Sequence, residues 1–140
     1  MQHEGGCHCG NLSVRLELTR PPAEYATRSC NCSFCRAHAT RTVSDPGGRV
    51  EIRASDWSRV ERYRFGSGTA DFLLCRTCGV YLGAVCETAV GTRAVTNVNS
   101  LMDRAAFPPA LSFPNHDEEL VEARLARRAA NWTPAVVYGA

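Results

Sequence analysis

Seven of the eight cysteines in this 140-residue chain fall into three short clusters. The clusters are Cys7 with Cys9, then Cys30 with Cys32 and Cys35, then Cys75 with Cys78, whereas Cys86 stands alone. Thiolates two or three residues apart can converge on one metal ion, and a tetrahedral zinc site takes four such ligands. The spacing therefore predicts a fold in which distant segments of the chain are joined through metal.

The first and third clusters are predicted to form one closed site. In GGCHCG, residues i and i+2 of an extended strand point to the same side, so Cys7 and Cys9 can share a metal while His8 faces away. CRTCG is typical of a metal-binding knuckle, in which Gly79 can adopt a positive φ where the chain leaves the turn. Together, Cys7, Cys9, Cys75 and Cys78 would hold a structural zinc that joins the start of the chain to its middle.

The central cluster, CNCSFC, offers three thiolates and no obvious fourth ligand. A zinc ion with three protein ligands keeps one position open for water or substrate, which is typical of catalytic zinc. Cys30, Cys32 and Cys35 are therefore the candidate catalytic residues as well as metal ligands. The alternative is a purely structural site closed by His38 or Cys86, although Cys86 follows an apolar run and is expected to be a buried small hydrophobe.

Composition and charge exclude several classes of function. All 16 basic residues are arginine, so a lysine Schiff base is excluded, and the net charge of +2 is too small to indicate nucleic-acid binding. The sequence shows no charged start followed by an apolar run, and no apolar stretch long enough to cross a bilayer. We therefore expect a cytoplasmic protein whose reduced thiols serve metal binding or catalysis rather than disulfides.

The pattern of short segments predicts one mainly β domain over residues 1–140. Residues 11–18 alternate apolar and polar side chains, which is typical of a half-buried strand. Further strands are expected at 21–30, where one would deliver the central cysteines, on both sides of a turn at 45–48, and at 70–75, 80–87 and 93–101. A short helical turn at 54–60 would be capped by Ser55 or Asp56.

A loop and a helix are predicted at about 105–132. Acidic residues stand at the start of this helix and arginines at its end, which matches the helix dipole: Asp117, Glu118, Glu119 and Glu122, then Arg124, Arg127 and Arg128. Its apolar face is thin, so we expect it on the surface with its charges solvated. His3 and His116 are also expected at the surface rather than as metal ligands.

Taken in order, the cysteine motifs resemble a known family. GGCHCGNLSV, CNCSFCR, FLLCRTCGVYL and VNSL, which extend from Gly5 to Leu101, are similar to the glutathione-dependent formaldehyde-activating family, also named with the centromere protein V domain. The resemblance implies an Mss4-like β-tent fold with two zinc ions on the same seven cysteines. It also implies a carbon–sulfur lyase that joins glutathione and formaldehyde into S-hydroxymethylglutathione.

Two functions follow from these patterns. The first is a zinc enzyme acting on the adduct of a thiol, such as glutathione, with formaldehyde or a similar small aldehyde. Arg36 and Arg41, close in sequence to the central cluster, are the candidates for orienting an anionic substrate. The second is a non-catalytic, zinc-stabilised module that binds a protein, glutathione or nucleic acid, and it would be favoured if a fourth ligand closed the central site.

Overall fold

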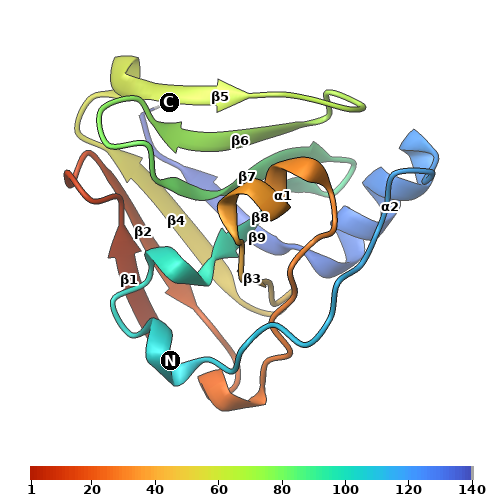
Figure 1. Ribbon diagram of the computed structural model, residues 1–140, viewed down its shortest axis with the longest axis horizontal. Coiled ribbons are helices and arrows are strands. Elements are labelled where there is room, and N and C mark those ends of the chain that lie inside the picture. The colour runs from red at the N-terminus through yellow and green to blue at the C-terminus, as the bar shows by residue number, and fades with distance from the viewer. Residues whose placement is uncertain (140) are drawn as a thin grey trace.

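The computed structural model describes residues 1–139 and is built around one nine-stranded sheet (Figure 1). Eight strands follow the order β1-β2-β4-β9-β8-β7-β6-β5, and β3 pairs with β8 beside this path. The strands are β1 (Gln2–Gly6), β2 (Leu12–Glu17), β3 (Thr42–Val43), β4 (Arg49–Ala54), β5 (Val60–Tyr63), β6 (Ala70–Cys75), β7 (Tyr81–Thr88), β8 (Gly91–Asn97) and β9 (Thr133–Val137).

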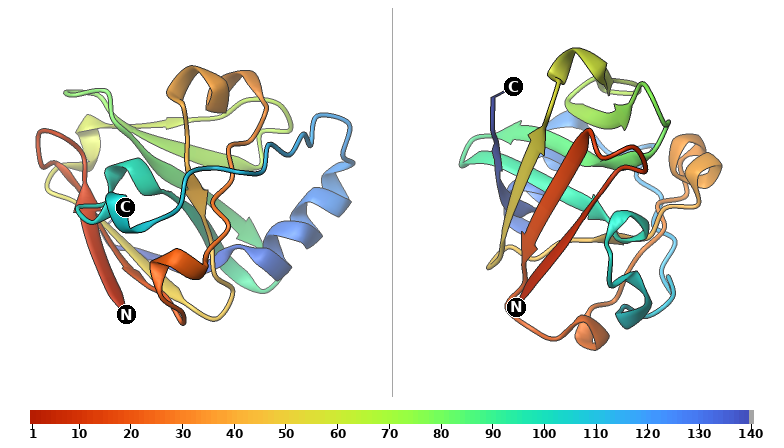
Figure 2. Two further views of the ribbon diagram at one scale, coloured as in Figure 1. Left: turned by 60° about the horizontal axis from the view of Figure 1, so that its bottom comes forward. Right: turned by 90° about the vertical axis from the view of Figure 1, so that its left-hand side faces the viewer.

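The sheet consists of two antiparallel groups that β9 joins. Strands β1, β2 and β4 form the first group and β5 to β8 the second, and the strands of the two groups run in different directions (Figure 2). Strand β9 pairs in parallel with β4 through Val50 and Ala135, and antiparallel with β8 through Ala94 and Thr133. The expectation of a mainly β fold with a short C-terminal helix is confirmed.

Burial follows the alternation that the sequence shows. In β2 the apolar residues are buried and the polar ones are exposed, as predicted. The buried apolar residues pack against β4 and the inner face of β6 to β8. A second, smaller apolar cluster on the other side of β6 to β8 contains Ala84, Cys86 and Trp132. It lies beneath α2 (Val121–Asn131), so β7 is covered on both faces.

Helical segments and turns connect these strands. The α-helix α1 (Ser33–His38) contains Cys35 and directly follows Cys32. Within residues 1–139 there are also four short 3-10 segments: η1 (Pro22–Glu24), η2 (Trp57–Arg59), η3 (Val98–Ser100) and η4 (Arg104–Ala106). Asp56 caps η2 by accepting from the Ser58 amide, as predicted. Within residues 1–139, no helix has the length and apolar character needed to span a membrane.

The predicted elements differ from the structure at residues 21–30, 98–101 and 133–137. The strand expected at 21–30 is wrong, because that segment contains η1 and then isolated bridges from Arg28 to Thr42 and Ser112. Prolines at 21 and 22 lack the amide donors that a ladder needs. The terminal strand β9 was not predicted, because TPAVV is short and contains a proline.

A buried carboxylate fixes the turn between β3 and β4. Asp45 accepts hydrogen bonds from Thr19, through both its amide (2.9 Å) and its hydroxyl (2.6 Å), from the Tyr25 hydroxyl (2.5 Å) and from the Gly47 amide (2.9 Å). Burial alone would raise the pKa of Asp45, but these bonds outweigh it and hold the pKa well below its ordinary value. As a charged acceptor, Asp45 therefore ties its own turn to the segment that connects β2 with α1.

Candidate metal centres and active site

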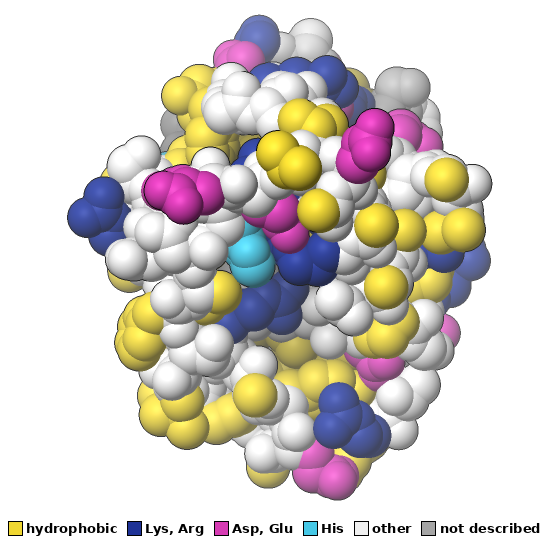
Figure 3. Space-filling view, turned by 90° about the vertical axis from the view of Figure 1, so that its right-hand side faces the viewer, with side chains coloured by type: hydrophobic (Ala, Val, Ile, Leu, Met, Phe, Trp, Pro, Cys, Tyr) yellow, Lys and Arg dark blue, Asp and Glu magenta, His cyan; other side chains and the backbone are white. Residues whose placement is uncertain are grey.

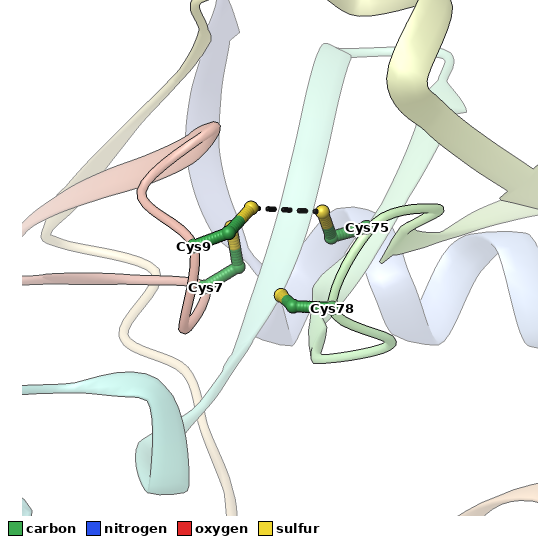
Figure 4. Close-up of side chains that lie close together, drawn as sticks. All are labelled: Cys7, Cys9, Cys75 and Cys78. Carbon is green, nitrogen blue, oxygen red and sulfur yellow. Dashed lines mark hydrogen bonds between the residues drawn. The ribbon is translucent and has the colours of Figure 1, made fainter.

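The first and third cysteine clusters meet at one point between two turns (Figure 4). The ligand sulfurs of Cys7, Cys9, Cys75 and Cys78 all lie within 4.8 Å of one another. The Sγ atoms of Cys7 and Cys9 are 3.7 Å apart, and those of Cys9 and Cys75 are 3.5 Å apart. In a tetrahedral site with zinc–sulfur bonds of 2.3 Å the sulfurs lie about 3.8 Å apart, so the four residues fit a zinc ion.

Each pair is presented by a tight turn. Cys7 and Cys9 lie in the turn that closes the β1–β2 hairpin, rather than in the extended strand expected, and the Gly10 amide donates to the Cys7 carbonyl (3.2 Å). Cys75 ends β6, and the knuckle closes when Gly79, at φ +79°, donates its amide to the Cys75 carbonyl (2.8 Å). His8 is exposed and belongs to neither metal-binding group, as predicted.

The knuckle also favours thiolates. Burial raises the pKa of Cys75, but hydrogen bonds from the amides of Cys78 and Thr77 outweigh it and bring the pKa to about 6. On the opposite turn, burial raises the pKa of Cys7 to about 11. The knuckle is thus the half of the site that offers deprotonated sulfur most readily.

The central cluster is shaped by α1. Cys32 caps this helix, and its Sγ accepts from the Cys35 amide at 3.4 Å. Ala39 ends the helix in the left-handed conformation at φ 48°, and together these features bring the sulfurs of Cys30, Cys32 and Cys35 within 4.8 Å of one another. A hydrogen bond from the Cys35 thiol brings the pKa of Cys30 to about 5.

The two residues considered as a fourth ligand lie elsewhere. The ring of His38 packs on Phe34, with 4.4 Å between centroids, and on Tyr81 at 5.7 Å. Cys86 is buried in the small cluster beneath α2, as predicted. Among residues 1–139, no further His, Cys, Asp or Glu joins the three-cysteine group.

The three-cysteine group opens onto a cavity of about 540 Å³, within the range of small-molecule sites. The cavity lies between α1, the aromatic side chains of Phe65, Phe72 and Tyr81, and the segment that leads into α2. Figure 3, which views the molecule from the side where α2 lies, shows basic side chains around this hollow. Five arginines and two carboxylates line it: Arg28, Arg36, Arg124, Arg127, Arg128, Asp117 and Glu119.

The prediction that the charges of α2 are solvated is wrong for its arginines. Arg124 and Arg127 both bind Glu119, and Arg127 does so through two nitrogens at 3.0 Å. These bonds bring the pKa of Glu119 to about 2. Arg128 is only 7% exposed, whereas Leu120 and Val121 at the start of the helix are exposed. The helix therefore turns its arginines toward the cavity.

The remaining predicted residues occupy different places. Arg36 is exposed and lines the cavity, whereas Arg41 donates to the carbonyls of Phe107 and Pro108, both at 2.9 Å, and so holds a neighbouring loop. His116 is half-buried at the cavity. His3 is buried, contrary to expectation, because its Nδ1 pairs with the Asp103 carboxylate at 2.6 Å.

Comparison with known proteins agrees with these sites. The family model of the glutathione-dependent formaldehyde-activating enzyme matches residues 2–114, which include all seven clustered cysteines. The chain belongs to this family. The resemblance seen in the cysteine motifs is thereby confirmed. Membership of this family supports a glutathione-related, formaldehyde-activating role, and the chain carries two cysteine groups that could bind metal.

A solved structure supports the fold of this family member. The crystal structure of a Rhodobacter sphaeroides protein matches it with a TM-score of 0.53 at 28% sequence identity. The match covers 71% of this chain and 87% of the other. Because the family match ends at residue 114, the arginines of α2 lie outside the matched part, although they line the same cavity as the central cysteines.

Proposed function

We propose that this chain catalyses the reversible addition of a thiol, such as glutathione, to formaldehyde or a similar small aldehyde. In the forward direction a sulfur–carbon bond forms, the carbonyl π bond breaks, and the thiol proton ends on the oxygen. The product is an S-hydroxymethyl thioether, and the reverse step is a carbon–sulfur lyase reaction. The proposal places one structural zinc on Cys7, Cys9, Cys75 and Cys78 and a second, catalytic zinc on Cys30, Cys32 and Cys35.

The observation that carries this proposal is that the three-cysteine group faces a cavity and has no fourth protein ligand among residues 1–139. Zinc held there by three thiolates would favour the deprotonated form of a substrate thiol at neutral pH. A closed structural site needs no such cavity, so the arrangement favours an enzyme over a binding module. Reduced thiols of this kind suit the cytoplasm, where we place the protein.

Side chains of the cavity account for the other requirements of the reaction. Phe65, Phe72 and Tyr81 form an apolar wall that restricts water near the reacting carbon. Burial raises the pKa of Tyr81, so its hydroxyl keeps its proton and can act as a donor. We assign Tyr81 as a donor to the oxygen that gains charge as the carbon–sulfur bond forms.

The test combines metal analysis with exchange kinetics. Freshly purified, reduced protein should contain two zinc ions per chain, one for each cysteine group. Magnetisation-transfer NMR would then follow exchange between formaldehyde and its glutathione adduct. Because the uncatalysed reaction is fast, the comparison is with Cys32→Ser protein at equal concentration. Native protein that binds glutathione without exceeding this control would favour the binding module. Protein that does neither would remove the formaldehyde assignment, and a different thiol substrate or the binding module would take its place.

A further inference from the structure

Within residues 1–139, Arg128 is a buried cation without a carboxylate partner. It is 7% exposed, and its Nη1 donates to the Thr69 hydroxyl at 2.8 Å and to the Cys86 sulfur at 3.6 Å. Neither partner carries a formal negative charge when Cys86 is a thiol. An isolated charge in such a place is costly, and burial accordingly lowers the pKa of Arg128. The fold therefore keeps a cation that nothing within residues 1–139 neutralises by direct contact.

The unused side of this guanidinium is the side that recognises carboxylates. Nε is buried and has no hydrogen-bond partner among the described residues, and no hydrogen bond from Nη2 is present there either. Nε and Nη2 form the edge of the guanidinium that can donate two parallel bonds to one carboxylate. The Trp132 ring lies 4.8 Å from the guanidinium carbon and supports the group from one side.

The neighbouring arginines do not share this property. Arg124 and Arg127 are neutralised by Glu119, and Arg124 also donates to the Ser67 hydroxyl (3.0 Å) and the His116 carbonyl (2.6 Å). Arg28 also lines the cavity without an ion pair in the described chain, and its Nη2 donates to the Ser44 hydroxyl at 3.0 Å. It lies two residues before Cys30, so thiolates of that cluster can balance it. Arg36 is exposed, so water can solvate its charge. Arg128 is therefore the buried arginine of the cavity that lacks an anionic partner among residues 1–139.

We propose that Arg128 binds a carboxylate of the substrate through Nε and Nη2, so that the cavity selects thiols that carry a carboxylate. The inference rests on the proposed function for the identity of the reacting group. It adds a specificity residue from α2, a segment beyond the part of the chain that the family model matches. Thiols without a carboxylate reach the three-cysteine group but lose this contact.

Two glutathione derivatives separate this inference from the proposed function. S-methylglutathione keeps both carboxylates and has no free thiol, so its binding reports the carboxylate contact alone. Glutathione diethyl ester keeps the thiol and has no carboxylate, so its exchange with formaldehyde reports the chemistry alone. In a Trp57→Phe background, Trp132 is the remaining tryptophan of the chain, and its fluorescence measures binding beside Arg128.

In this background, Arg128→Met should weaken S-methylglutathione binding about 10- to 100-fold and leave ester turnover within about threefold. Arg127→Met is the matched control, because it removes the same charge from the same helix but from a cation that is already paired with Glu119. It should weaken S-methylglutathione binding about threefold or less. Arg128→Lys keeps the charge without the two-donor edge, so its affinity for S-methylglutathione should lie between those of Arg127→Met and Arg128→Met. It also provides a second variant if Arg128→Met does not fold.

Equal losses in Arg127→Met and Arg128→Met would overturn the inference, because general electrostatic attraction would then explain binding. Undiminished S-methylglutathione binding by Arg128→Met would also overturn it. If wild-type protein turns over the ester as efficiently as glutathione and does not bind S-methylglutathione, carboxylate selection is wrong while the proposed reaction stands. If S-methylglutathione binds through Arg128 and no thiol is turned over, the carboxylate site stands while the reaction is wrong.

Discussion

Replacing one ligand at each metal centre should separate their roles, and Cys78→Ser should be the more damaging change. The four-cysteine group links Cys9 to Cys75 across 66 residues. For a crosslink of that length, the loop-closure relation gives a stabilisation of about 4 kcal/mol. A domain of this size is stable by only about 5–15 kcal/mol, so the loss is a large share of the total.

The same relation predicts a smaller effect at the central site. Cys30 and Cys35 are five residues apart, and a loop of that length gives about 2 kcal/mol at most. Serine at position 32 also remains a good cap for α1, a role that the Cys32 sulfur fills now. Cys32→Ser should therefore stay folded and keep the zinc of the four-cysteine group.

Circular dichroism melts of reduced, zinc-loaded protein would measure the difference. With an unfolding entropy typical of 140 residues, the stabilisation lost in Cys78→Ser lowers Tm by about 14 °C, and the stabilisation lost in Cys32→Ser lowers it by about 7 °C or less. A metal chelator should reduce the Tm of Cys32→Ser toward that of Cys78→Ser. The reasoning is refuted if Cys78→Ser melts within about 3 °C of the native protein, or if Cys32→Ser lowers Tm more than Cys78→Ser does.

Two further predictions concern single side chains. Asp45→Asn should destabilise the fold by about 3 kcal/mol at pH 7, measured by urea denaturation. Because the pKa of Asp45 is depressed in the folded state, the difference in unfolding free energy between the native protein and Asp45→Asn should be complete above about pH 4 and shrink as the pH falls further. A free-energy difference that grows in acid would contradict this prediction. Tyr81→Phe should keep its zinc and its Tm but reduce the exchange rate at saturating glutathione about 10- to 100-fold, and an unchanged rate would exclude Tyr81 as the donor.

The sequence predicted the grouping of the cysteines better than the surroundings of the cavity. Spacing alone separated the four outer cysteines from Cys30, Cys32 and Cys35, because ligands two or three residues apart constrain the local backbone strongly. The alternation in β2 was equally informative, since burial on one face leaves a period of two.

The arginines of α2 show where sequence reasoning reached its limit. Arg127 and Arg128 lie three and four positions after Arg124 and so share a helix face with it, a signal that was present in the sequence. No local sequence signal shows whether that face points to solvent or to the cavity, because its direction depends on how the helix packs on the cluster that contains Trp132. His3 was missed for a similar reason, since its partner Asp103 is 100 residues away.

The position of β9 determines when this protein can complete its fold during synthesis. Residues 133–137 insert between β4 and β8, so the two halves of the sheet cannot be joined until this strand has left the ribosome. Until then, the nascent chain presents two unpaired strand edges, which are templates for association with other chains. The pairing is also of high contact order, which slows folding. Shielding of these edges by chaperones should therefore matter most before β9 has emerged and paired with β4 and β8.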